Sequence, residues 1–277
     1  MSKFANKVAA ITGAGSGIGR ALALDLASRS CQLALCDIDE EGLKETAAEA
    51  TGRGVRVTTH KVDVADRHAV HDWADQVVVD HGTVNFIFNN AGVAMGSTIE
   101  GMSYEDFEWL LNTNLWGVVY GTKAFLPHLK DSGDGHIINV SSIFGLAGVP
   151  TQGAYNAAKF AVRGFTECLR QELDMTRCGV SATSVHPGGV KTSIARSARM
   201  NSNIGDLGMD TQSSNEKFEK AFITSPEKAA RSILRAVEKK QRRVLVGPDA
   251  YDYVWMVRLL PSRYQDVSRR FAKFAMR

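Results

Sequence analysis

The sequence predicts an α/β fold, a doubly wound sheet of seven mainly parallel strands with helices on both faces. Short apolar runs alternate along the chain with longer segments of helical periodicity. This alternation implies right-handed crossovers between parallel strands. No Pro/Ser-rich linker and no internal repeat interrupts the pattern, so the 277 residues are expected to form one domain rather than two.

The first half of the chain supplies four of the expected strands. Apolar runs place them at residues 7–12, 32–37, 55–60 and 84–89. Ile18, Leu22 and Leu26 have helical spacing within 17–30, and a second helix is expected at about 40–50. A third helix begins after Asp66, which can cap it, and runs to about Val79, with Gly82 after its end.

The second half repeats the alternation. It is expected to contain helices at 104–130 and 152–177, strands at 136–141 and 180–185, a polar region at 193–224, a helix from Pro226 to about Lys240, and a last strand at 243–246. Pro261 divides the remaining residues into two short helices.

Composition narrows the class of protein. Hydrophobic residues make up 44% and charged residues 23%, which excludes a disordered chain, a collagen and a coiled coil. The net charge of +3 is too small to indicate nucleic-acid binding. Residues 258–277 carry six basic residues and one acidic residue, so the excess of positive charge belongs to the tail.

The cysteines and the amino terminus indicate a cytoplasmic protein. Cys31 and Cys36 lie in an apolar run, and neither a CxxC pair nor zinc-ligand spacing occurs. Buried thiols suit a reducing compartment. The sequence shows no secretory signal and no run of about 18 apolar residues that would span a membrane.

A glycine-rich loop follows the first strand and precedes the first helix, over residues 12–19. Glycines allow a tight turn and a close approach to a pyrophosphate, which the helix N-terminus attracts. The strand–loop–helix context favours dinucleotide binding, in a Rossmann-type sheet, over a simple turn.

Asp37 ends the second strand, 18 residues after Gly19. An acidic residue at this spacing accepts hydrogen bonds from the adenosine ribose and repels a 2′-phosphate. Ser16 and Ile38 are not basic, so NAD is favoured over NADP. The alternative is a solvated aspartate at a strand end.

Tyr155 and Lys159 lie four residues apart in a helical segment and therefore share a face. A nearby ammonium lowers the pKa of a phenol from about 10, which lets tyrosine act as a general acid or base. Ser142, at a strand end, can hydrogen-bond a reacting oxygen. The alternatives are a surface Tyr/Lys pair and a serine that precedes a helix.

In these features the chain resembles the short-chain dehydrogenase/reductase family over about residues 5–248. The matching positions are 12–19 (TGAGSGIG), Asp63-Val64, 89–92 (NNAG), Asn114, Ser142, 155–159 (YNAAK), Pro187-Gly188 and Thr192.

The resemblance implies a role for each matching position. Asn114, Ser142, Tyr155 and Lys159 would be catalytic, with Asn114 holding a water that continues a proton path from Lys159. The cofactor contacts would be Gly13, Ser16, Gly17, Ile18, Gly19, Asp63, Val64, Asn90, Ala91, Gly92, Tyr155, Lys159, Pro187, Gly188, Val190 and Thr192. Asp63 would bind the adenine amino group, and Thr192 would lie near the nicotinamide carboxamide. The alternative for Asn114 is a helix-interior residue satisfied by backbone.

The residues expected around the substrate are apolar. Met95 and Phe144 belong to this group, and no arginine stands among them to hold a carboxylate or phosphate. The expected substrate is a hydrophobic secondary alcohol or ketone, bound by Ser142, Phe144, Tyr155 and Met95. The resemblance makes residues 193–224 a substrate lid, with a surface insertion as the alternative.

Aromatic and basic residues mix in the extension, residues 251–277. They fit a segment that packs over the pocket or a neighbouring subunit, which is favoured, or a peripheral membrane contact. Nucleic acid is not expected as a partner.

The sequence therefore predicts an NAD-dependent alcohol dehydrogenase or ketone reductase, and the resemblance implies a homodimer or homotetramer formed through the helices at 104–130 and 152–177. An NADP-dependent carbonyl reductase and a non-catalytic dinucleotide-binding regulator are the alternatives.

Overall fold

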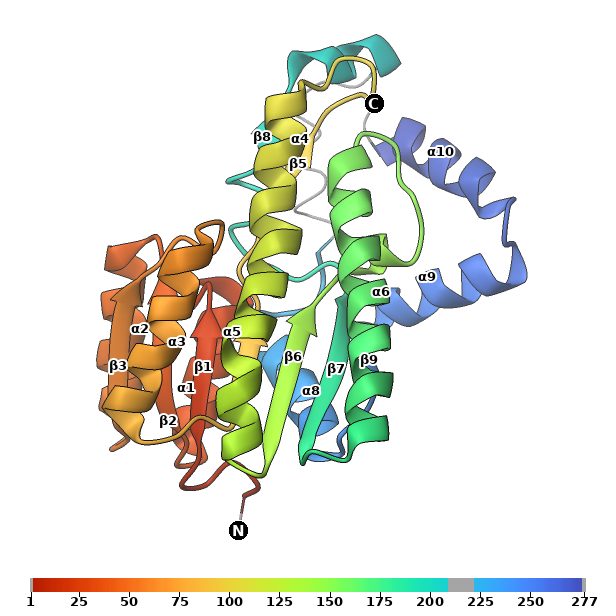
Figure 1. Cartoon of the computed structure of the whole chain (residues 1–277). Helices are drawn as coiled ribbons and strands as arrows, with labels where there is room; N and C mark the ends of the chain where they lie inside the picture. Colours follow the sequence, from red (N-terminus) through yellow and green to blue (C-terminus); the bar gives the residue numbers. More distant parts are fainter. Residues whose placement is uncertain (1, 209–221, 276–277) are drawn as a thin grey trace.

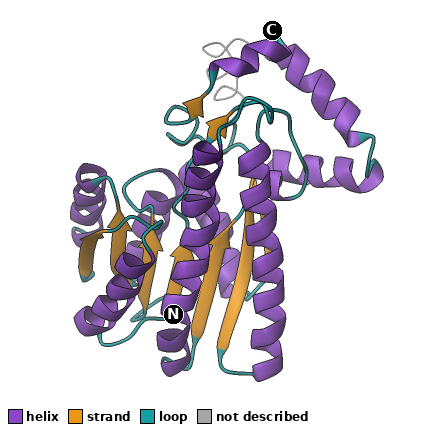
Figure 2. Ribbon diagram, turned by 45° about the horizontal axis from the view of Figure 1, so that its top comes forward, coloured by secondary structure: helices purple, strands orange, loops and turns teal. Residues whose placement is uncertain are grey.

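A computed structural model describes residues 2–208 and 222–275 and shows a central sheet between two layers of helices (Figures 1 and 2). In the described residues the sheet has seven strands in the order β3-β2-β1-β4-β6-β7-β9, and every neighbouring pair is parallel. The expected doubly wound α/β fold is confirmed.

The strand order reverses direction at β1. The strands are β1 (Val8–Thr12), β2 (Gln32–Asp37), β3 (Val57–Lys61), β4 (Phe86–Asn89), β6 (Gly135–Val140), β7 (Val180–Pro187) and β9 (Arg243–Val246). The chain runs outward from β1 through β2 to β3 and then returns to place β4 on the other side of β1. In such sheets a crevice opens at the carboxyl ends of the strands where the order reverses, and ligands bind there.

Alternate residues of β1 contact opposite helical layers, because successive side chains of a strand point to opposite faces. Ala9 and Ile11 pack with α1 (Gly17–Ser28), α2 (Glu40–Thr51) and α8 (Pro226–Glu238). The opposite core contains Val8 and Ala10 with α3 (Arg67–His81), α5 (Gly117–Asp131) and α6 (Gly153–Thr176). Each face of the sheet therefore has its own hydrophobic core.

The expected ends of α3 are confirmed. The Asp66 carboxylate accepts hydrogen bonds from the backbone N–H groups of His68 at 2.8 Å and Ala69 at 3.2 Å. Gly82 follows with a φ of 76°, a left-handed conformation that glycine adopts without strain. Cys31 and Cys36 are buried, as expected.

The helix expected over residues 104–130 is interrupted. It divides into α4 (Tyr104–Leu111), a π-helical turn (Asn112–Trp116) and α5. The turn lets the Asn114 side chain hydrogen-bond the backbone of Val93 outside the helix. The periodicity of the sequence cannot predict the π-helical turn, because the apolar residues on either side of it keep their helical spacing.

Short elements complete the carboxyl edge. β5 (Met95–Gly96) pairs with β8 (Arg199–Met200), and 3₁₀ turns occupy Ile143–Gly145 and Ser202–Leu207. These elements are too short to produce a periodic pattern in the sequence, so they could not be predicted.

The extension forms a helical hairpin, α9 (Pro248–Leu259) and α10 (Tyr264–Ala275), with Pro261 between the helices as expected. Its elbow projects away from the rest of the chain in both views (Figures 1 and 2). Among the described residues, no helix combines the length and the apolar character that crossing a bilayer requires.

Candidate active site

The loop between β1 and α1 leaves no room for a side chain at Gly13 or Gly19. A Cβ atom added to Gly19 would lie 2.0 Å from the Gly13 carbonyl oxygen, and one added to Gly13 would lie 2.8 Å from the Ala91 Cα. Gly13 and Gly17 also have φ values of 66° and 54°, which side chains disfavour. The backbone of this loop is therefore accessible to a pyrophosphate at the N-terminus of α1.

The end of β4 holds this loop in place. The Asn90 amide donates to the carbonyl oxygens of Thr12 at 2.9 Å and Gly13 at 3.2 Å. The Thr12 hydroxyl accepts from the backbone N–H groups of Asn90 and Ala91, each at 3.0 Å. Asn90 and Ala91 thus support the turn as well as border the expected ribose site.

The carboxylate of Asp37 faces the glycine loop. Its Oδ2 accepts from the Gly15 backbone at 2.8 Å and its Oδ1 from the Asp39 backbone at 3.0 Å. The neighbouring Ile38 is 62% exposed and offers no positive charge to a 2′-phosphate. Lys61 lies opposite Asp37 on the neighbouring strand β3. Its ammonium group pairs with the Glu40 carboxylate, with 2.7 Å between Nζ and Oε1.

Asp63 and Val64 follow β3 at the same edge of the sheet. Asp63 is exposed, and its Oδ1 accepts from the Ala65 backbone at 2.9 Å. Val64 is buried against Gly117, where an added Cβ would lie 2.8 Å from the valine Cγ2. The structure therefore leaves the Asp63 carboxylate open to an adenine amino group.

Ser142, Tyr155 and Lys159 come together from the end of β6 and the start of α6. The Lys159 ammonium lies 5.6 Å from the centroid of the Tyr155 ring and donates to the Val140 carbonyl oxygen at 3.1 Å. Ser142 lies close enough to Tyr155 to oppose the rise in the pKa of its phenol. The predicted catalytic residues are thus neighbours.

Burial shapes the proton affinities of this cluster. Burial raises the pKa of Tyr155 to about 12, an effect that the neighbouring Ser142 partly offsets. Burial lowers the pKa of Lys159 to about 8. The chain alone therefore keeps Tyr155 protonated at neutral pH, and additional positive charge is needed to make it a base.

Asn114 is buried and bound on both sides of its amide. Its Oδ1 accepts from the Val93 N–H and its Nδ2 donates to the Val93 carbonyl oxygen, both at 2.8 Å. A Cβ added to Gly92 would lie 2.9 Å from that Oδ1 and 3.6 Å from the Lys159 Nζ. Asn114 therefore positions the loop beside Lys159, which matches the backbone-satisfied alternative.

Two positioning residues were missed from the sequence. His186 contacts the Ser142 carbonyl oxygen at 3.0 Å and the Ser184 hydroxyl at 2.9 Å, and burial lowers its pKa to about 4. Asn156 donates to the Phe144 carbonyl oxygen at 2.7 Å and accepts from the Val149 N–H at 3.1 Å. The position of Asn156 inside the YNAAK segment was the only signal available for it.

The loop after β7 meets the glycine loop from across the crevice. A Cβ added to Gly17 would lie 2.9 Å from the Thr192 Cγ2, and Val190 is buried and bridges to Thr224. The Pro187–Gly188 stretch is supported by Asp249, whose Oδ2 accepts from the Gly189 N–H at 2.6 Å. Asp249 was also missed, because it belongs to α9, 60 residues further along the chain.

Aromatic residues cover the substrate side of Tyr155. The ring of Phe144 lies 6.2 Å from the ring of Tyr155 and 6.4 Å from that of Tyr253. Met95 is buried, and it packs with Leu110 in a small core that Tyr155 borders. Met95 thus supports Tyr155 from within the protein.

The expected lid is anchored where the structure describes it. The Asn203 Oδ1 accepts from the Thr98 backbone at 3.0 Å, and the Arg199 guanidinium lies 3.5 Å from the centroid of the Trp109 ring. Residues 209–221 of the expected lid lie outside the described residues.

The chain belongs to the short-chain dehydrogenase family, whose model matches residues 7–203. It is therefore an oxidoreductase with a nicotinamide-dinucleotide site, as the glycine loop and the Tyr155–Lys159 pair indicated.

Similarity extends beyond the matched segment. The chain is 50% identical to SadH of Mycobacterium tuberculosis, provisionally described as an oxidoreductase, over 99% of this chain and 98% of SadH. It is 30% identical to human estradiol 17-beta-dehydrogenase 11, over 95% of this chain and 82% of that protein. A short-chain dehydrogenase/reductase from Burkholderia phymatum, solved with NAD, matches with a TM-score of 0.86 and 29% identity over 96% of this chain and 97% of that one. The dinucleotide site is consistent with NAD.

Proposed function

We propose that this protein transfers a hydride between NAD(H) and a hydrophobic secondary alcohol or ketone, with Tyr155 as the general acid and base. The observation that carries the proposal is the cluster in which Lys159 lies 5.6 Å from the Tyr155 ring and Ser142 lies close enough to Tyr155 to lower the pKa of its phenol. When bound, NAD would supply the hydride acceptor and a positive charge beside this cluster.

The protein's own groups handle the proton. In ketone reduction, the Tyr155 hydroxyl donates its proton to the developing alkoxide, while the Ser142 hydroxyl hydrogen-bonds the same oxygen. In alcohol oxidation, Tyr155 accepts the proton. The Lys159 ammonium and a nearby cofactor charge lower the phenol pKa from about 12 towards the working range.

An apolar substrate is supported by the surroundings of Tyr155. The Phe144 ring lies beside Tyr155 and the Tyr253 ring lies beside Phe144, and apolar surface of this kind favours apolar ligands by removing them from water. The estradiol dehydrogenase named above acts, by its name, on a steroid alcohol, which belongs to the class proposed here.

The Tyr155→Phe variant tests the mechanism. We expect turnover to fall by about 10²-fold to 10⁴-fold, because the acid–base group is lost, while NAD affinity stays within a few-fold of wild type. Nicotinamide absorbance with a panel of alcohols and ketones measures turnover, and a titration measures NAD binding. Wild-type turnover in this variant would show that Tyr155 is not the acid–base group. Faster turnover of charged sugars than of apolar secondary alcohols would contradict the proposed substrate class.

Asp37→Ala tests the preference for NAD over NADP. The Asp37 carboxylate repels a 2′-phosphate and can bind ribose hydroxyls, so we expect the ratio of kcat/KM for NAD to that for NADP to fall at least about tenfold. Asp39→Ala, two residues away on the cap of α2, serves as the control. An unchanged ratio would count against Asp37 as the residue that binds the adenosine ribose.

We further propose that the protein is a homo-oligomer. Trp116 and Phe160 are 45% and 42% exposed at the helices expected to form the contact, and large exposed apolar side chains of this kind suit subunit interfaces. Sedimentation velocity of the full chain distinguishes monomer, dimer and tetramer, and a monomer at micromolar concentration contradicts the proposal.

A further inference from the structure

The α9–α10 hairpin has two unlike sides. One side packs on the active-site loops, where the Tyr253 ring lies 6.4 Å from the Phe144 ring and the Tyr264 hydroxyl accepts from the Gly148 N–H at 3.2 Å. This contact agrees with the packing expected for the extension. It accounts for only part of the hairpin, since Ala250 is the one residue of α9 that is buried.

The other side of α9 carries an exposed apolar stripe. Tyr251, Trp255 and Leu259 follow one another at intervals of four residues and so share a helix face. Trp255 is 57% and Leu259 is 72% exposed, and the exposed Leu260 continues the stripe into the elbow. The elbow projects to one side, away from the rest of the chain (Figures 1 and 2).

Arginines surround the stripe. Residues 255–270 contain four arginines and one aspartate. Among the described residues, Arg258, Arg263 and Arg270 form no ion pair, and Arg269 pairs with Asp266. The Arg258 guanidinium lies 5.9 Å from the Trp255 ring centroid, so the aromatic and cationic groups form one surface.

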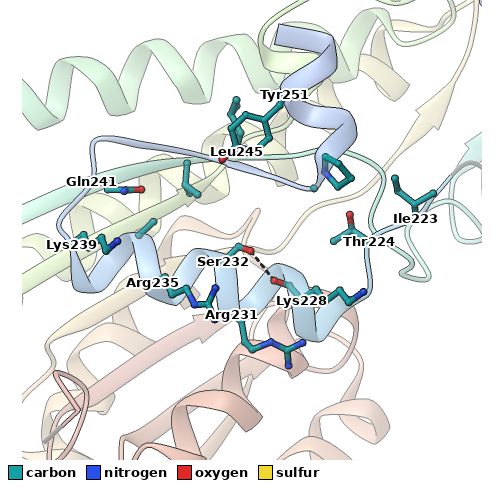
Figure 3. A pocket seen from close by; sticks show the side chains of 14 residues that line it. Ile223, Thr224, Lys228, Arg231, Ser232, Arg235, Lys239, Gln241, Leu245 and Tyr251 are labelled. Carbon is teal, nitrogen blue, oxygen red and sulfur yellow. Dashed lines mark hydrogen bonds between the residues drawn. The ribbon is translucent and has the colours of Figure 1, made fainter. Parts of the chain in front are cut away.

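Positive charge continues at the base of the hairpin. A groove of about 570 Å³ lies between α8, β9 and α9, and Tyr251 forms part of its wall (Figure 3). Exposed cations of α8 and of the residue that follows it line the groove at helical spacing, and none has an ion pair within the described ranges: Lys228, Arg231, Arg235 and Lys239. Among the described residues that line the groove, none is acidic.

We propose that the elbow of the α9–α10 hairpin, residues 255–263, docks the enzyme on an anionic lipid surface. Trp255, Leu259 and Leu260 would enter the interface, where tryptophan is favoured, and the arginines would bind headgroup phosphates. A second copy of the chain is the less suitable occupant, because it presents the same excess of arginines, whereas an anionic bilayer presents opposite charge.

Flotation of the full chain with vesicles tests the docking. Binding is expected to vesicles of phosphatidylcholine with phosphatidylglycerol, to be weak on phosphatidylcholine alone, and to fall as salt rises from about 0.05 M to about 0.5 M. Absence of binding to the anionic vesicles at low salt overturns the proposal, as does equal binding to both kinds of vesicle.

Matched pairs of substitutions assign the effect to the elbow. Trp255→Ser with Leu259→Ser, and separately Arg258→Glu with Arg263→Glu, should each lower vesicle partitioning at least about tenfold. The apolar control replaces two residues that are 76% and 82% exposed elsewhere, Val79→Ser with Met175→Ser. The charge control, Lys44→Glu with Arg56→Glu, lies near the opposite edge of the sheet, on α2 and before β3.

Turnover in solution separates this proposal from the proposed function. All of these variants should keep wild-type activity on a water-soluble ketone, because none of the replaced residues touches the catalytic cluster. If elbow and control variants partition equally, the elbow is not the docking site. If vesicles are not bound and the apolar elbow variant changes the sedimentation coefficient instead, a second copy covers the stripe and the lipid proposal fails.

Discussion

The loops after β1 and β7 face each other across one crevice but depend on distant side chains to different degrees. The loop after β1 takes its shape from its own glycines, with Gly13 and Gly19 in direct contact, and the Asn90 amide holds that shape from the end of β4. The loop after β7 depends on a distant side chain, since Asp249 of α9 accepts the Gly189 N–H. A turn defined by backbone conformation is local, whereas one defined by a side-chain contact exists only in the folded chain.

The largest expected effect belongs to the first loop. Gly19→Ala places a methyl group where a Cβ lies 2.0 Å from the Gly13 oxygen, so we expect NAD affinity to fall at least about 10²-fold because the loop must shift. Isothermal titration with NAD measures this.

Gly164→Ala is the matched control, because a Cβ there meets nothing within 4 Å. Gly164 lies inside α6, where alanine is the better helix former, so this variant should gain roughly 0.5–1 kcal/mol of stability. Near-normal NAD binding by Gly19→Ala would show that the contact between Gly13 and Gly19 does not fix the shape of the first loop.

A smaller effect is expected in the second loop. Asp249→Ala removes a charged acceptor from the Gly189 N–H, at a cost of about 1.5–3 kcal/mol, which corresponds to about tenfold to 10²-fold in NAD affinity if the loop moves. Asp249→Asn keeps an acceptor and should lose less. Asp252→Ala, on the exposed side of the same helix, should have no effect. Equal losses of NAD affinity in Asp249→Ala and Asp252→Ala would show that the Asp249 contact does not support the cofactor site.

Acid stability is expected to depend on the strands that precede the second loop. Burial lowers the pKa of His136 on β6 to about 3 and that of His186 on β7 to about 4. Both values lie below those of an unfolded histidine, so the unfolded chain binds protons first as the pH falls. The free energy of unfolding should therefore decrease below about pH 6.5, by about 1.4 kcal/mol per pH unit for each group.

Urea unfolding between pH 7 and pH 4.5, compared between wild type and His136→Gln, measures this slope. The slope in the His136→Gln variant should be smaller by roughly the contribution of one histidine, and His68→Gln, at an exposed position, serves as the control. An unchanged slope in His136→Gln would show that the acid sensitivity arises elsewhere.

Much of the fold could be predicted because it depends on local patterns. The apolar runs located the seven main strands to within a few residues, and Asp66 and Gly82 marked the ends of α3. The π-helical turn at Asn112–Trp116 and the pairing of β5 with β8 could not be predicted. Both depend on contacts between distant segments, such as that of Asn114 with Val93.

The candidate site divides in the same way. The sequence by itself determined the glycine loop, the place of Asp37 at the end of β2 and the places of Ser142, Tyr155 and Lys159, since their spacing and their positions near strand ends require little beyond strand–helix alternation. Only the tertiary structure decided that His186, Asn156 and Asp249 support these residues and that the hairpin has both a packed and an exposed face. Hydrogen bonds and burial between segments dozens of residues apart leave no periodic trace in a sequence, because they exist only once the chain has folded.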